Sequence, residues 1–181
     1  MSTAADSTRR ETSRTGIAIF LLTDAITFLA LFGAYAVFRA KSPPWPHGAA
    51  LYSHPLAALL TALLLGSAVV LRTAVRSSGA KAGRLLLLTA ACGALFLAGQ
   101  AFEYAHLAKK GFTPGAGIVP AVFYVLTGLH GLHVLAGVLL LAAAAGITAR
   151  GGRPGLLDGA TFYWLFVDAV WVFLLVFVYV F

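Results

Sequence analysis

The sequence predicts an all-α membrane protein, a polytopic helix bundle with five transmembrane helices. Hydrophobic residues make up 60% of the 181 residues and charged residues only 10%, against about a quarter in ordinary soluble domains. Five apolar runs are each long enough to cross the hydrocarbon core of a bilayer. The runs are continuous and rich in Leu and Ala, so they predict helices, because the strands of a membrane barrel would be short and alternating.

The five spans follow one another along the chain with short gaps between them. A polar leader of mixed charge, residues 1–15, precedes the first span; it is expected to be disordered and shows no cleavable signal peptide. The rest of the chain, 16–181, is expected to form a single transmembrane domain. Its spans are predicted at Gly16–Phe38, Leu56–Val75, Leu85–Leu107, Ile118–Thr148 and Ala160–Phe181.

Each span has its own boundary signals. The first is interrupted only by Asp24 and ends at the proline-rich gap KSPPWPHG. The second and third are separated by RSSGAKAGR, and the third is followed by KKGFTPGAG, both rich in glycine and charge. The fourth is long enough to tilt or to begin with an interfacial turn at Pro120. The gap RGGRPGLLDG then precedes the fifth span.

The distribution of Lys and Arg predicts the orientation. The leader and the second and fourth gaps carry nine of these residues, and the opposite side carries four. Cytoplasmic loops are enriched in Lys and Arg, so the N-terminus is expected inside and the C-terminus outside. The net charge of +7 does not indicate nucleic-acid binding, because the basic residues lie in short gaps and form no basic patch or helix.

Three acidic residues, Asp24, Glu103 and Asp168, lie within the apolar spans. An ionised group there costs about 2.5–3.5 kcal/mol on insertion scales, so each is expected to have a partner, a bound proton or nearby water. Asp24 and Asp168 each lie about 12 Å from the inner end of their spans, at about 1.5 Å per residue. They are therefore expected either to face one inner-leaflet cavity or to contact a neighbouring subunit.

Glu103 and His130 are predicted to form a hydrogen bond between the third and fourth spans. Each lies about 27 Å from the inner end of its span. His133, three residues after His130, is expected on the same side of the fourth span. A purely structural role as interhelical contacts remains open for the histidines and for Asp24, and Glu103 lies close enough to the headgroups for solvation.

No metal, haem or catalytic residue is expected in this chain. His130, His133 and Glu103 would supply three metal ligands, but no further histidine lies at that depth, and axial haem ligands must come from opposite sides. The single cysteine, Cys92, excludes a disulfide or a CxxC site within the chain. The sequence also contains no GxSxG, Walker or dinucleotide-binding motif.

Four segments resemble the cytochrome c oxidase subunit III family. The fourth span contains FYVLTGLHGLHVLAG and the fifth YWLFVDAVWVF, similar to the family patterns F-F-x-x-T-G-x-H-G-x-H-V-x-x-G and Y-W-H-F-V-D-x-V-W. The segment QAFEY resembles the family's Q-x-x-E-Y, and LLTDAITF resembles its S-E-x-x-F segment. The four occur in the family's order over nearly the whole chain. Two residues depart from the pattern: Leu165 replaces a histidine, and Asp24 replaces a glutamate.

The resemblance implies a non-catalytic component of a haem-copper respiratory oxidase, in which subunits I and II are the partners and carry haem and copper. A family member of this kind would hold phospholipid between its helices, support proton uptake and oxygen access, and lie in the inner (plasma) membrane of a bacterium. Five-helix members begin inside and end outside, as the charge count predicts. Asp24 corresponds to the family's cleft carboxyl; Glu103, His130, His133 and Asp168 are expected to make interhelical polar contacts.

Two other functions remain open. One is an accessory subunit of a nitric oxide reductase, which belongs to the same superfamily. The other is an independent small transporter or channel, although the sequence has no inverted repeat and no pair of interrupted helices.

Overall fold

The computed structural model of the chain describes residues 2–41, 53–152 and 154–180. In these ranges the long helices are α1 (Ser2–Lys41), α2 (His54–Val75), α3 (Gly79–Lys109), α4 (Ile118–Ala149) and α5 (Pro154–Leu174). A short 3-10 turn, Pro114–Ala116, precedes α4, and a π-helical segment, Leu175–Val180, continues α5. Five helices are long and apolar enough to cross a membrane, which confirms the predicted fold class.

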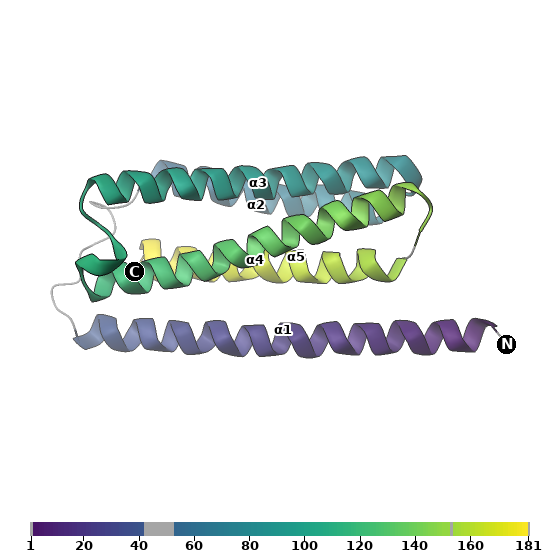
Figure 1. Cartoon of the computed structure of the whole chain (residues 1–181), viewed down its shortest axis with the longest axis horizontal. Helices are drawn as coiled ribbons and strands as arrows, with labels where there is room; N and C mark the ends of the chain where they lie inside the picture. The colour runs from purple at the N-terminus through teal and green to yellow at the C-terminus, as the bar shows by residue number, and fades with distance from the viewer. Residues whose placement is uncertain (1, 42–52, 153, 181) are drawn as a thin grey trace.

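Helices α2 to α5 form a four-helix bundle, and α1 lies along one side of it, where it packs against α4 and α5 (Figure 1). The two chain ends lie at opposite ends of the molecule, as five crossings require. The N-terminus, the α2–α3 turn and the α4–α5 connection share one end of the bundle. This is the end whose segments carry nine of the Lys and Arg residues.

Helix α1 begins at Ser2, so the leader that was expected to be disordered is helical. The leader contains no glycine or proline before Gly16. Once the apolar span has formed a helix, each further residue adds a hydrogen bond without a new nucleation step. The part of α1 that is apolar enough to span a membrane begins at Thr15, close to the predicted start of the first span.

The helices α3 and α5 also begin earlier than predicted. Helix α3 starts at Gly79 rather than Leu85, and α5 starts at Pro154 rather than Ala160. The first turns of both helices contain glycine and charged residues, yet the helix continues through them, because a helix does not have to end where the hydrocarbon core ends. The early start of α3 changes the depth of every polar residue on that helix.

Glycines end α3 and α4 in the same way. After α3, the N–H of Phe112 donates to the carbonyl of Leu107 and the N–H of Gly111 to that of Ala108, both at 3.0 Å. This double closure requires a left-handed residue, and Gly111 has φ 78°. The end of α4 repeats the pattern around Gly151, whose φ is 75°. Two sharp turns are thereby built from local sequence.

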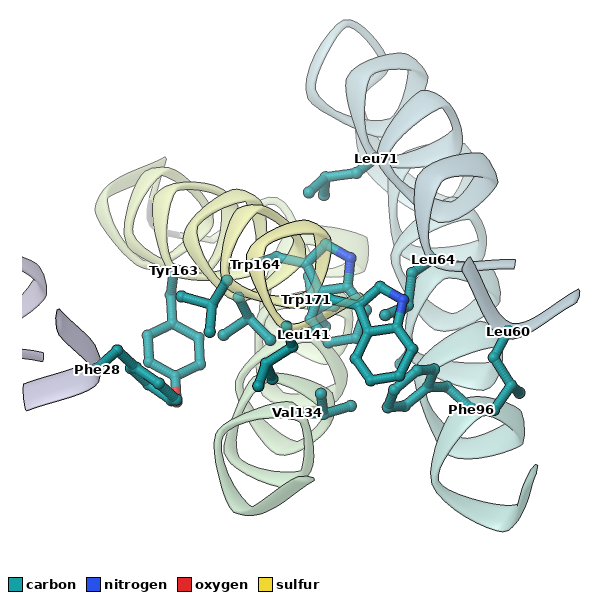
Figure 2. Packing of buried hydrophobic residues seen from close by; sticks show 14 of the residues in the cluster. Phe28, Leu60, Leu64, Leu71, Phe96, Val134, Leu141, Tyr163, Trp164 and Trp171 are labelled. Carbon is teal, nitrogen blue, oxygen red and sulfur yellow. The ribbon is translucent and has the colours of Figure 1, made fainter. Parts of the chain in front are cut away.

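The indole of Trp164 occupies the centre of the four-helix bundle (Figure 2). It packs against Gly93 of α3 and Gly137 of α4. A Cβ added at these glycines would lie 2.4 Å and 2.7 Å from the indole, respectively. Small residues allow helices in membranes to approach closely, and here they make room for one of the two buried tryptophans.

Candidate functional site

The first polar site joins α1 to α4 through Asp24 and His133. The Nε2 atom of His133 lies 3.3 Å from Oδ2 of Asp24. The Nδ1 atom of the same ring lies 2.8 Å from the carbonyl oxygen of Leu129. A carbonyl only accepts hydrogen bonds, so Nδ1 carries the hydrogen, and Nε2 is the acceptor in the neutral ring. Although the two atoms are 3.3 Å apart, Oδ2 of Asp24 has no hydrogen-bond partner among the described residues.

Aromatic rings surround this pair from α1 and α5. Phe28 meets the ring of His133 edge-on at 5.1 Å, and Tyr163 lies stacked on it at 6.5 Å. The hydroxyl of Tyr163 also donates to the backbone carbonyl of His133 at 3.1 Å. Figure 2 shows Phe28 and Tyr163 on facing helices. The Asp24 and His133 side chains remain 19% and 17% exposed, so the pair lies at the edge of the bundle rather than in its core.

The predicted hydrogen bond between Glu103 and His130 is absent. Glu103 instead accepts the backbone N–H of Ser53 at 2.9 Å. Its other carboxylate oxygen has no hydrogen-bond partner in the part of the chain that the structure describes. Ser53 immediately precedes α2, so Glu103 ties the outer part of α3 to the start of α2. This contact leaves the carboxylate nearly fully buried.

The error in that prediction comes from the depth of Glu103. Because α3 begins at Gly79, Glu103 lies about 36 Å from the start of its helix rather than about 27 Å. His130 lies deeper, at the level of Phe96 and Trp171. Its ring stacks on Trp171 at 5.3 Å and meets Phe96 edge-on at 5.7 Å. His130 therefore faces α3 and α5, whereas His133 faces α1.

Asp24 and Asp168 lie at similar heights, as their spacing predicts, but in different surroundings. Phe20, four residues before Asp24, stacks near Tyr163, five residues before Asp168, with ring centroids 6.2 Å apart. Asp168 is buried, and neither of its carboxylate oxygens has a hydrogen-bond partner among residues 2–41, 53–152 and 154–180. A cavity shared by the two aspartates stays a prediction.

Sequence reasoning did not find three interhelical contacts made by hydroxyl groups. In each, a Ser or Thr hydroxyl donates to a carbonyl of its own helix and accepts a hydrogen bond from an aromatic side chain of another helix. The hydroxyl hydrogen is used locally, so the neighbouring indole N–H or phenol O–H must be the donor. The pairs are Trp164–Ser67 and Trp171–Thr61, both at 2.9 Å, and Tyr104–Thr127 at 2.7 Å.

The hydroxyl contacts are hard to foresee, because a threonine in an apolar span usually bonds only to its own helix. The tryptophans give the better signal, since a buried indole N–H usually finds a partner. Among the described residues, no group of three or more His, Cys, Asp or Glu is close enough to hold a metal ion. The location of haem and copper in partner subunits stays a prediction.

Comparisons with known proteins agree with this arrangement. Residues 3–181 match the family described as Cytochrome c oxidase subunit III. The cytochrome c oxidase subunit 3 of Synechocystis sp. is 36% identical, with 91% of this chain and 73% of the relative covered. The corresponding protein of Corynebacterium diphtheriae is 33% identical, with 91% and 85% covered. A cytochrome bo(3) ubiquinol oxidase subunit 3 from Pseudomonas putida is also 33% identical, with 91% and 83% covered.

The resemblance seen in the four sequence motifs is thus confirmed over nearly the whole chain. Two residues depart from the family pattern. Asp24, in place of a glutamate, contacts His133, and Leu165, in place of a histidine, is a half-buried residue of α5 next to Trp164 in the sequence. With five helices able to cross a membrane and matches that span residues 3–181, this multi-pass membrane protein belongs to the cytochrome c oxidase subunit III family.

Proposed function

We propose that the chain is the non-catalytic subunit III of a bacterial haem-copper oxidase, which reduces oxygen and translocates protons. It packs beside subunits I and II, which carry the haem and copper, in the inner (plasma) membrane. The observation that carries this proposal is the family match over residues 3–181, together with subunit 3 relatives from both cytochrome c and ubiquinol oxidases that cover 91% of the chain. This chain itself contributes no redox centre.

The Asp24–His133 pair supports a role in proton uptake. A carboxyl group and an imidazole lie 3.3 Å apart there, and both side chains remain partly exposed at the edge of the bundle. A group that exchanges protons during turnover must be reachable from water or from a proton-conducting partner. The pair meets this requirement better than Asp168 or His130, which are buried in the core.

The position of α1 supports phospholipid binding. Helix α1 packs against α4 and α5 along one side of the bundle. Large apolar side chains on its other faces stay exposed, with Ile19, Leu22 and Leu29 between 59% and 68% accessible. Acyl chains of phospholipid suit such a face, and lipid held along α1 would seal the subunit against its partner.

Affinity purification of the tagged chain from its native membrane in mild detergent tests the proposal. The expected result is a complex that contains haem by its reduced-minus-oxidised spectrum and consumes oxygen with either cytochrome c or quinol as donor. A complex that reduces nitric oxide and consumes no oxygen would establish the reductase alternative instead. Recovery of the chain alone, without a haem-bearing partner, would contradict both and favour an independent transporter or channel.

A further inference from the structure

Gln100 of α3 and His130 of α4 are two buried polar residues at the same level of the bundle. The Tyr104–Thr127 hydrogen bond, 2.7 Å long, sets the register between these antiparallel helices. One turn deeper, four residues back along α3 and three residues forward along α4, lie Gln100 and His130. The two side chains are 4% and 1% exposed. Neither amide atom of Gln100 and neither ring nitrogen of His130 has a hydrogen-bond partner in the described ranges.

Such an arrangement is costly if it stays dry. A buried polar group without a hydrogen bond costs about 1–3 kcal/mol, and buried side-chain polar atoms in native proteins are nearly always paired. A residue of another subunit cannot reach these atoms, because both side chains are enclosed by the bundle. At the same level, the rings of Phe96 and Trp171 pack against the ring of His130. Only a small molecule can serve as the missing partner.

The packing of α4 leaves space at this level. Gly128 and Gly131 flank His130, and a Cβ at either would meet a single atom within 4 Å, the Tyr104 hydroxyl or a methyl of Leu97, each at 3.8 Å. At Gly93, deeper in the bundle, an added Cβ would lie only 2.4 Å from the indole of Trp164. Helix α4 is therefore less tightly packed around His130 than α3 is beside the tryptophan.

We propose that a bound water molecule bridges Gln100 and His130 between α3 and α4. A neutral imidazole offers one donor and one acceptor, and the amide offers both, so water complements the two groups in either orientation. Buried waters typically make about three hydrogen bonds. The Tyr104 hydroxyl, which donates to Thr127, lies beside the Gln100 amide and is a further polar group at this level.

A high-resolution map of the purified protein, in whatever complex it occupies, tests the site directly. The expected result is an ordered water peak within about 2.7–3.2 Å of a His130 ring nitrogen and of the Gln100 amide. Water peaks elsewhere in the same map serve as the control for detection. Well-ordered Gln100 and His130 side chains with no peak between them, or bonded directly to each other, would overturn the proposal.

The substitution Gln100→Leu provides a second test through the sign of its effect. If water bridges the pair, the variant leaves His130 and the water with one hydrogen-bond partner fewer. The tagged variant should then lose solubility at a temperature at least about 2–4 °C below that of the unsubstituted chain. If no water is bound, the substitution removes an unpaired buried amide, and the temperature of this transition should stay the same or rise. Thr89→Val on the same helix is the control, because the Thr89 hydroxyl donates to the Leu85 carbonyl of its own helix, and this variant should show little change.

Discussion

At the residue scale, a single hydrogen bond decides the chemistry of the most accessible polar pair. The Leu129 carbonyl holds the hydrogen of His133 on Nδ1, so Nε2 faces Asp24 as an acceptor unless the ring is fully protonated. Oδ2 of Asp24 lies 3.3 Å from this nitrogen and has no hydrogen-bond partner among the described residues. An acidic group in an apolar span is expected to have a partner or a bound proton, and His133 is the nearest candidate partner.

This leads to different outcomes for two substitutions at Asp24. Asparagine keeps an N–H donor for Nε2 of His133, so Asp24→Asn should preserve packing and assembly while it lowers proton uptake or durability during turnover. Asp24→Leu removes the contact and should also cost about 0.6–1.7 kcal/mol, the range for interhelical polar contacts in membranes. Thermal stability of the purified protein, together with sustained turnover of the complex, measures both effects. Failure of the Asn variant to assemble would show that the carboxylate is structural.

A second residue-scale prediction concerns Trp171 and Thr61, which join α5 to α2 at 2.9 Å. Thr61→Val keeps the shape of the side chain but removes the acceptor, and Trp171→Phe removes the donor. Each should destabilise the protein, and the double variant should lose less than the sum by about 0.6 kcal/mol. A double-mutant cycle on thermal stability measures this coupling. Strict additivity would mean that the hydrogen bond contributes nothing.

At the element scale, small residues decide how closely the helices approach. Gly93 and Gly137 receive Trp164, and at Gly83 an added Cβ would lie 2.9 Å from the Cβ of Ala149 on α4. Lipid offers no strong hydrophobic drive for helix association, so close van der Waals contact and interhelical hydrogen bonds carry much of the packing energy. The bundle of α2 to α5 is held by close packing and by interhelical hydrogen bonds, whereas α1 packs only along one side of it, against α4 and α5.

The prediction at this scale is that Gly93→Ala is destabilising and Gly66→Ala is not. The added methyl at Gly93 would overlap the indole of Trp164, with an expected cost of about 1–3 kcal/mol for overpacking. Gly66 lies on an exposed face of α2 with nothing within 4 Å of an added Cβ, so alanine there should be neutral or stabilising. Thermal unfolding of the two variants in the same detergent gives the comparison. Equal stability would mean that Trp164 moves without cost.

At the scale of the whole molecule, the five helices bring the basic segments to one end. The N-terminus, the α2–α3 turn and the α4–α5 connection share that end, and these segments carry nine of the Lys and Arg residues. The positive-inside rule then predicts that this end faces the cytoplasm. The fold alone is compatible with either orientation.

Accessibility of introduced cysteines tests the orientation. In a Cys92→Ala background, Thr113→Cys lies in the exposed segment between α3 and α4, and Ser78→Cys lies at the exposed turn between α2 and α3. A membrane-impermeant thiol reagent added to intact cells should label the cysteine at position 113 and spare the one at position 78 until the membrane is opened. The reverse pattern would place the N-terminus outside.

The sequence by itself determined the number of helices, their approximate limits, the end of the bundle that is basic and the family. These properties depend on local composition, on the length of apolar runs and on motifs that stay readable one segment at a time. It also singled out Asp24 and His133, because an ionisable residue in an apolar span is conspicuous wherever its partner lies.

Only the tertiary structure decided which polar residues meet. Glu103 and His130 were predicted to form a hydrogen bond because they were assigned equal depths. Helix α3 begins six residues earlier than predicted, so Glu103 lies about 9 Å farther from the start of its helix. There it accepts the backbone N–H of Ser53. Partner choice depends on helix register, tilt and rotation, which arise from packing among all five helices. A residue's distance from the end of its own span contains none of that information.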